Sequence, residues 1–241
     1  MPLTIAHPAI ILPVLRYSRN AAFVTGLFIG CLTPDFEYFL CAQLTSTISH
    51  TVLGQFIFCL PVGIILTLLW QVVIKKPLLA NMPQWFRMRL SSVHSSHING
   101  FNQWLFCCLG LIFGSFSHII WDSFTHESGY FVKLMPLLGN SQLGSIPVYK
   151  FAQHFSTAIG LMALGLYLFW LQPTPEVSAE PTPWKYWFPL AFFFITTFLL
   201  LWYLIPDQGH RHSIGNKIVW LHTAGIVSLV LAGFTRLRYG S

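Results

Sequence analysis

The chain has 241 residues, of which 54% are hydrophobic and only 8% are charged, and its formal net charge is +6. A soluble globular domain carries about 25% charged residues, so 8% is too few to cover a water-facing surface, and most of this surface must face lipid. The thirteen Lys and Arg residues are scattered in short segments between apolar runs, which is typical of membrane proteins and argues against a nucleic-acid partner.

We expect an all-α, polytopic helical membrane protein that forms a single integral membrane domain over residues 1–241, with five or six transmembrane helices. A spanning helix needs about 20 mostly apolar residues. A first stretch, Ala21–Leu40, is weak because its second half contains Pro34, Asp35 and Glu37, so it either spans or forms a half-buried helix. Five later stretches have the required length and composition: Val52–Ile74, Phe101–Trp121, Phe151–Leu171, Tyr186–Ile205 and Lys217–Phe234.

Two connecting segments divide the apolar stretches. Residues 75–100 are predicted to form a basic cytoplasmic loop, and residues 172–185, with four prolines, an extended connector. If six helices span and the N-terminus lies inside, nine of the thirteen Lys and Arg residues fall on the inner side. The positive-inside rule favours this orientation.

The end of the 101–121 stretch carries the strongest candidate site. His118, Asp122 and His126 are spaced by four residues, so on a helix they share one stripe, and residues at i and i+4 can ligate one metal ion. Gly110 and Gly114 continue the stripe as a small-xxx-small pattern, which predicts the close approach of a second helix. The simpler interpretation of the polar stripe is a polar contact between helices.

A second group of candidates lies nearer the N-terminus. Pro34 interrupts helical hydrogen bonding and would aim Asp35 away from the helix line, where its carboxylate could bridge two metal ions. His50 could supply a nitrogen ligand on the same side, and His7 could complete the set. The simpler interpretation of Asp35 is a capping residue, and Glu37 would point elsewhere on a helix.

Three segments carry a resemblance to a known family: Pro2–Ala9, Pro34–Phe39 and Ser117–His126. They resemble bacterial domain-of-unknown-function family 4184, over most of the chain. That family is similar in pattern to proteins described as membrane-bound metal-dependent hydrolases. The resemblance implies a bacterial membrane protein. Together with the count of Lys and Arg residues, it predicts a multi-pass protein of the bacterial cytoplasmic (inner) membrane, with its candidate site toward the periplasmic or outer face.

A looser likeness is to zinc-dependent phospholipase C. It implies six metal ligands: His7, Asp35, His50, His118, Asp122 and His126. Two departures stand out: only three residues separate Asp122 from His126, and no carboxylate follows His154 at the fourth position.

Nitrogen and carboxylate ligands without thiolates suit a divalent metal, zinc in the first place, with manganese or iron as alternatives. The leading hypothesis is a membrane-embedded hydrolase that uses a metal-activated water against a lipid or lipid-linked phosphoester or ester. Membrane lipids would be its partners and the source of its substrate. The candidate catalytic carboxylates are Asp35, Glu37 and Glu127.

Two other functions fit the same residues. One is a metal-ion or proton-coupled transporter, since histidines and carboxylates inside a membrane also build ion pathways. The other is a non-catalytic scaffold.

The candidates for hydrogen bonds to the ligands are Ser117, Ser123, Thr125 and Glu127. Arg211, between His210 and His212, could hold a phosphate, although a solvated loop is the simpler interpretation.

Overall fold

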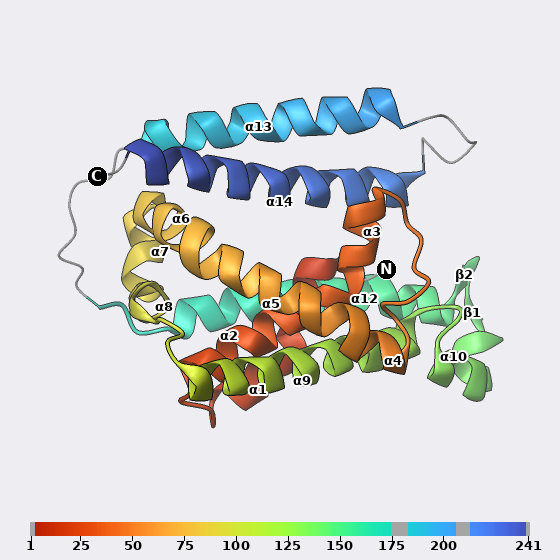
Figure 1. Ribbon diagram of the computed structural model, residues 1–241. Coiled ribbons are helices and arrows are strands. Elements are labelled where there is room, and N and C mark those ends of the chain that lie inside the picture. The colour runs from red at the N-terminus through yellow and green to blue at the C-terminus, as the bar shows by residue number, and fades with distance from the viewer. Residues whose placement is uncertain (1–2, 175–182, 206–212, 240–241) are drawn as a thin grey trace. The chain divides into compact units, whose positions relative to one another are not determined.

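The structure is a computed structural model that describes residues 3–174, 183–205 and 213–239, and helices form most of this part of the chain (Figure 1). In chain order its elements are η1 (Thr4–Ile11), α1 (Leu12–Leu15), α2 (Ala21–Gly30), η2 (Thr33–Asp35), α3 (Phe36–Cys41), α4 (Val52–Gly54), η3 (Gln55–Cys59), α5 (Leu60–Leu69), η4 (Trp70–Ile74), α6 (Lys75–Asn81), α7 (Gln84–Arg89), α8 (Ser91–Ser95), α9 (Phe101–Thr125), α10 (Tyr130–Leu134), α11 (Pro136–Gly139), β1 (Gln142–Leu143), β2 (Ile146–Pro147), α12 (Val148–Trp170), α13 (Pro183–Leu204) and α14 (Ile214–Tyr239). The label η marks 3-10 helices at η1 and η2 and π-helices at η3 and η4.

Six helical segments in the described residues are long and apolar enough to cross a membrane. This confirms the predicted helical membrane protein, with six candidate spans rather than five. The weak first stretch is one of them, as the segment Ala21–Cys41. Its helix is interrupted as Pro34 requires, because α2 ends at Gly30 and a 3-10 turn leads through Asp35 into α3.

The chain divides into two compact units, which we describe separately. The first unit comprises Met1–Asp35, Thr47–Ile64 and Ile98–Trp170. The second comprises Phe36–Ser46, Ile65–His97 and Leu171–Ser241. The candidate ligands predicted from the sequence all belong to the first unit.

Helices α2 and α9 form the centre of the first unit, where they pack side by side through glycines on both partners (Figure 1). A Cβ atom built on Gly26 would lie 2.1 Å from the carbonyl oxygen of Cys107, and one built on Gly114 would lie 2.3 Å from that of Leu27. Gly30 and Gly110 meet the opposite backbone in the same way. The small-xxx-small pattern of α9 therefore does bring a second helix close, and that helix carries a matching pattern of its own.

The start of the chain lies at the end of α9 that carries Asp122. His7 contacts the side chain of Asp122, and Thr4 contacts that of Asp35, whereas Arg16 and Arg19 precede α2 at the opposite end of that helix. The membrane side of the N-terminus stays a prediction. Between His7 and Arg16 the chain forms η1 and α1, and the side chain of Asn20 then caps α2.

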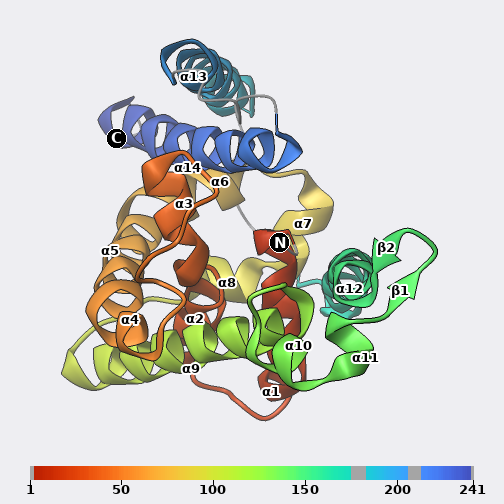
Figure 2. The ribbon, with the colours of Figure 1, turned by 90° about the vertical axis from the view of Figure 1, so that its right-hand side faces the viewer.

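Beyond the end of α9, the first unit continues as short elements. Helices α10 and α11 follow, and then the antiparallel pair β1–β2, in which Gln142 faces Pro147 and Leu143 faces Ile146. Figure 2 shows α11 and this hairpin beside the start of α12. Helix α12 also packs against η1, where Gly160 lies next to Ala6.

The second unit contains α3, α6 to α8, α13 and α14. Residues 75–100, predicted as a basic loop, instead contain α6, which ends the helical segment Val52–Asn81 that is long and apolar enough to cross a membrane, followed by the short helices α7 and α8. Lys75 is buried and donates hydrogen bonds to Gln71 and to the backbone carbonyl of Ser96. Of the predicted connector 172–185, residues 175–182 lie outside the described residues.

Candidate metal centre

Four side chains from three separate parts of the chain converge in the first unit. Asp35, His50, His118 and Asp122 each offer one ligand atom, and these atoms lie within 4.8 Å of one another. Asp35 ends η2, His50 lies in the turn before α4, and the other two lie on α9. Two carboxylates and two imidazoles at this spacing form a donor set that suits a divalent transition metal.

The carboxylates of Asp35 and Asp122 flank the ring of His118. Its Nε2 atom lies 3.5 Å from Asp35 Oδ1 and 3.3 Å from Asp122 Oδ2. The Nε2 atom of His50 lies 3.6 Å from each of the same two oxygens. Each imidazole nitrogen therefore faces both carboxylates across a gap longer than an ordinary hydrogen bond.

The tautomer of His118 follows from its other nitrogen. Nδ1 lies 2.7 Å from the backbone carbonyl of Cys31 and must donate to it, so in a neutral ring Nε2 carries a lone pair. That lone pair faces acceptor oxygens, and both His118 Nε2 and Asp35 Oδ1 are buried without a hydrogen-bond partner among the described residues. Such groups are costly to bury, and a cation between them removes the cost.

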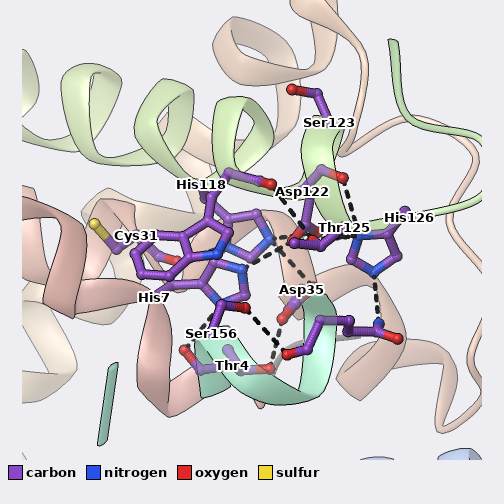
Figure 3. Close-up of polar contacts among 12 residues, drawn as sticks. Thr4, His7, Cys31, Asp35, His118, Asp122, Ser123, Thr125, His126 and Ser156 are labelled. Carbon is purple, nitrogen blue, oxygen red and sulfur yellow. Dashed lines mark hydrogen bonds and ion pairs between the residues drawn. The ribbon is translucent and has the colours of Figure 1, made fainter. Parts of the chain in front are cut away.

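Asp122 presents its two oxygens to different neighbours. Oδ2 faces His118 and His50, whereas Oδ1 lies 3.0 Å from His7 Nε2 and 3.4 Å from His126 Nδ1 (Figure 3). The ring of His7 stacks on that of His118 with 3.7 Å between centroids and 9° between planes. His7 thus lies beside the four-residue cluster as a partner of Asp122, and direct ligation by His7 stays a prediction.

Hydrogen bonds from neighbouring residues hold the ligands. Thr4 Oγ1 donates to Asp35 Oδ2 at 2.5 Å, which fixes the carboxylate and leaves Oδ1 facing the cluster. Ser49 Oγ lies 3.0 Å from His50 Nδ1. Such outer partners orient metal ligands and tune their basicity. Neither Thr4 nor Ser49 was predicted from the sequence, where the one available signal is that each lies within three residues of a candidate histidine.

His126 lies at the end of α9, where the backbone becomes extended. Its Nδ1 lies 3.1 Å from the backbone carbonyl of Asp122, and its Nε2 lies 3.3 Å from the amide nitrogen of Gln153 on α12. Donation from Nδ1 and acceptance at Nε2 satisfy both ring nitrogens. Direct ligation by His126 stays a prediction, and Gln153 is a contact that sequence reasoning missed.

The remaining candidates are not members of the four-residue cluster. Glu37 belongs to the second unit, where its carboxylate accepts a hydrogen bond from Ser46 at 3.1 Å. Glu127 is exposed and contacts the hydroxyl of Tyr149. Of the four proposed hydrogen-bond partners, Thr125 contacts His126 at 3.3 Å, whereas Ser117 and Ser123 donate to backbone carbonyls. Arg211, with His210 and His212, lies outside the described residues.

Comparisons with known proteins give one match. A family model described as Domain of unknown function (DUF4184) matches residues 1–234. No curated protein and no solved structure matches the chain. The match covers nearly the whole sequence, including every member of the cluster, while the likeness to hydrolases stays a prediction.

Proposed function

The chain belongs to the family described as Domain of unknown function (DUF4184), and we propose that it is a membrane-embedded, metal-dependent hydrolase with its centre at Asp35, His50, His118 and Asp122. Its substrate would be a lipid or lipid-linked phosphoester or ester. The metal would be zinc in the first place, with manganese or iron as alternatives.

One observation carries the proposal: the buried, unpartnered atoms Asp35 Oδ1 and His118 Nε2 face each other at 3.5 Å. Either an imidazolium at His118 or a cation in the cluster would remove the free-energy cost of burying these two atoms without a partner. A cation also accounts for the second carboxylate and the second imidazole in the same space. When bound, it would acidify a coordinated water and polarise a phosphoryl or acyl oxygen.

The residues of the chain would prepare the centre for this chemistry. The Cys31 carbonyl holds His118 with Nε2 inward, and Thr4 holds Asp35 with Oδ1 inward. Asp122 connects the cluster to His7 through its second oxygen. With every ligand held by a second contact, little reorganisation is needed when a substrate binds.

The location of the cluster supports a substrate that comes from the membrane. It lies near the end of α9, a transmembrane helix, where the side chains of His50 and His126 are 24% and 25% exposed. Arg16 and Arg19 precede α2, at the end of that helix away from Asp35. By the positive-inside rule, we propose that the cluster faces the outer side of a bacterial cytoplasmic membrane.

The test uses the full chain purified and reconstituted in vesicles of phosphatidylethanolamine and phosphatidylglycerol. After chelation, the protein is reloaded with zinc, manganese or iron, and released headgroup and fatty acid are measured by mass spectrometry. We expect turnover that returns with metal and is absent from Asp35→Asn protein. Metal bound at the centre without turnover of either lipid would overturn the activity.

The transporter alternative is tested in the same vesicles, by measuring uptake of the metal into the lumen. Metal-dependent hydrolysis without uptake supports the proposal, whereas uptake abolished by Asp35→Asn, without hydrolysis, would replace it.

A further inference from the structure

The residues that follow α9 form a short apolar segment at the end of this helix that carries the metal cluster. At 1.5 Å per residue, the 25 residues of α9 extend about 37 Å, which is enough to cross the roughly 30 Å of a hydrocarbon core. The helix ends at Thr125, so the chain after His126 continues from this end of the helix. We refer to residues 130–147, which comprise α10, α11, β1 and β2, as the platform.

The platform is packed firmly against the end of α9. The ring of Phe131 stacks on that of Phe124 with 4.2 Å between centroids, and Val132 is only 3% exposed. Gly129, at the turn into α10, lies so close to the backbone of Ser123 that an added Cβ would be 2.4 Å from its carbonyl oxygen. The platform is thus an ordered element with a defined outer face.

Large hydrophobic side chains are exposed along the platform. Tyr130 is 68% exposed, Leu134 61% and Leu137 67%. Further large hydrophobic residues exposed on the platform are Met135, Leu143 and Ile146. Six exposed large hydrophobic residues in one short segment indicate a membrane or protein contact.

We propose that the platform docks into the boundary between headgroups and acyl chains in the leaflet on the metal-cluster side. A lipid surface is the occupant that the observations favour, because the platform directly continues a transmembrane helix and cannot leave the bilayer surface. Its chemistry also fits this depth: leucines provide an apolar face, Tyr130 suits the headgroup level, and exposed Lys133 can reach anionic headgroups.

Docking would bring lipid headgroups to the opening of the cluster. Only three residues separate His126, at the end of α9, from Tyr130, at the start of α10. A lipid whose chain lies along the platform would have its headgroup bond near His126. This consequence rests on the proposed hydrolase function, whereas the membrane contact itself does not.

The membrane contact can be measured with an environment-sensitive fluorophore on Leu137→Cys. Cys41→Ser and Cys108→Ser remove the two cysteines that are not buried. The matched control carries the label on Lys150→Cys, at an exposed charged residue in the first turn of α12, outside the platform. Full-length protein is reconstituted in phosphatidylethanolamine–phosphatidylglycerol vesicles that contain lipids with a nitroxide at the top of the acyl chain.

We expect the label at position 137 to lose most of its emission to the lipid nitroxide and little to aqueous iodide, with the reverse for position 150. Quenching of position 137 by iodide would overturn the proposal. So would protection from both quenchers, since that outcome means that protein covers the platform. Metal content of the labelled protein is measured in parallel, so that loss of the cluster is distinguished from failure of the platform to dock.

Discussion

The Nδ1 atom of His118 donates a 2.7 Å hydrogen bond to the backbone carbonyl of Cys31. This contact joins α9 to the residue that follows α2, the helix it meets through glycines on both sides. The packing of two transmembrane helices thereby determines which nitrogen of His118 faces the cluster. The glycine contact and the candidate metal centre are parts of one arrangement.

The carboxylate of Asp122 lies within 4 Å of four histidines of the site, so Asp122→Asn should be an informative substitution. It keeps the size of the side chain but removes the charge that faces His118, His50 and His7. We expect bound metal per protein, measured by elemental analysis, to fall by more than about 10-fold. His94→Ala, in α8 of the second unit, is the control and should leave the metal content unchanged; an equal loss in both proteins would contradict the assignment.

His118 and His126 should differ in their effect on metal binding, although both lie on one stripe. Nε2 of His118 is buried and lacks a hydrogen-bond partner, whereas both ring nitrogens of His126 have partners in Gln153 and the backbone of Asp122. His118→Ala should therefore abolish metal binding, and His126→Ala should retain most of it. Competition with a chelator of known affinity measures the difference, and a greater loss for His126→Ala would show that His126 is the direct ligand.

Thr4 should tune the affinity of the centre without being a ligand. Thr4→Val preserves shape but removes the hydrogen bond to Asp35 Oδ2, so we expect metal affinity to fall by about 10–100-fold. Thr4→Ser retains the hydroxyl and should restore affinity close to that of the original protein. If serine and valine weaken binding equally, the effect comes from packing of η1 and not from the hydrogen bond.

The glycine contact between α2 and α9 should limit stability. A methyl group at Gly26 would lie 2.1 Å from the Cys107 carbonyl oxygen, so Gly26→Ala must push the helices apart and should destabilise the protein by about 1–3 kcal/mol. Gly165→Ala in α12 is the matched control, since no atom lies within 4 Å of its added methyl and alanine favours a helix by about 1 kcal/mol. Thermal unfolding in detergent should show a lower Tm for the first variant only.

Local patterns in the sequence accounted for the membrane class and for part of the site. Hydropathy over about 20 residues indicates a span because a helix must cross a fixed thickness of hydrocarbon. Helical geometry alone puts His118 and Asp122 on one face together with Gly110 and Gly114. These predictions need only the period of a helix, and the structure confirms the helix and its glycine contact.

Only the tertiary structure decided which distant residues meet that face. Thr4 and His7 approach through a short helix that enters from the site end, and Gln153 reaches His126 from α12. Such contacts join residues as many as 115 positions apart, and they depend on how helices pack against one another rather than on the period of any one of them. The sequence by itself therefore determined a membrane protein with a polar stripe, and packing decided that Asp35 and His50 meet His118 and Asp122 while Glu37 belongs to the other unit.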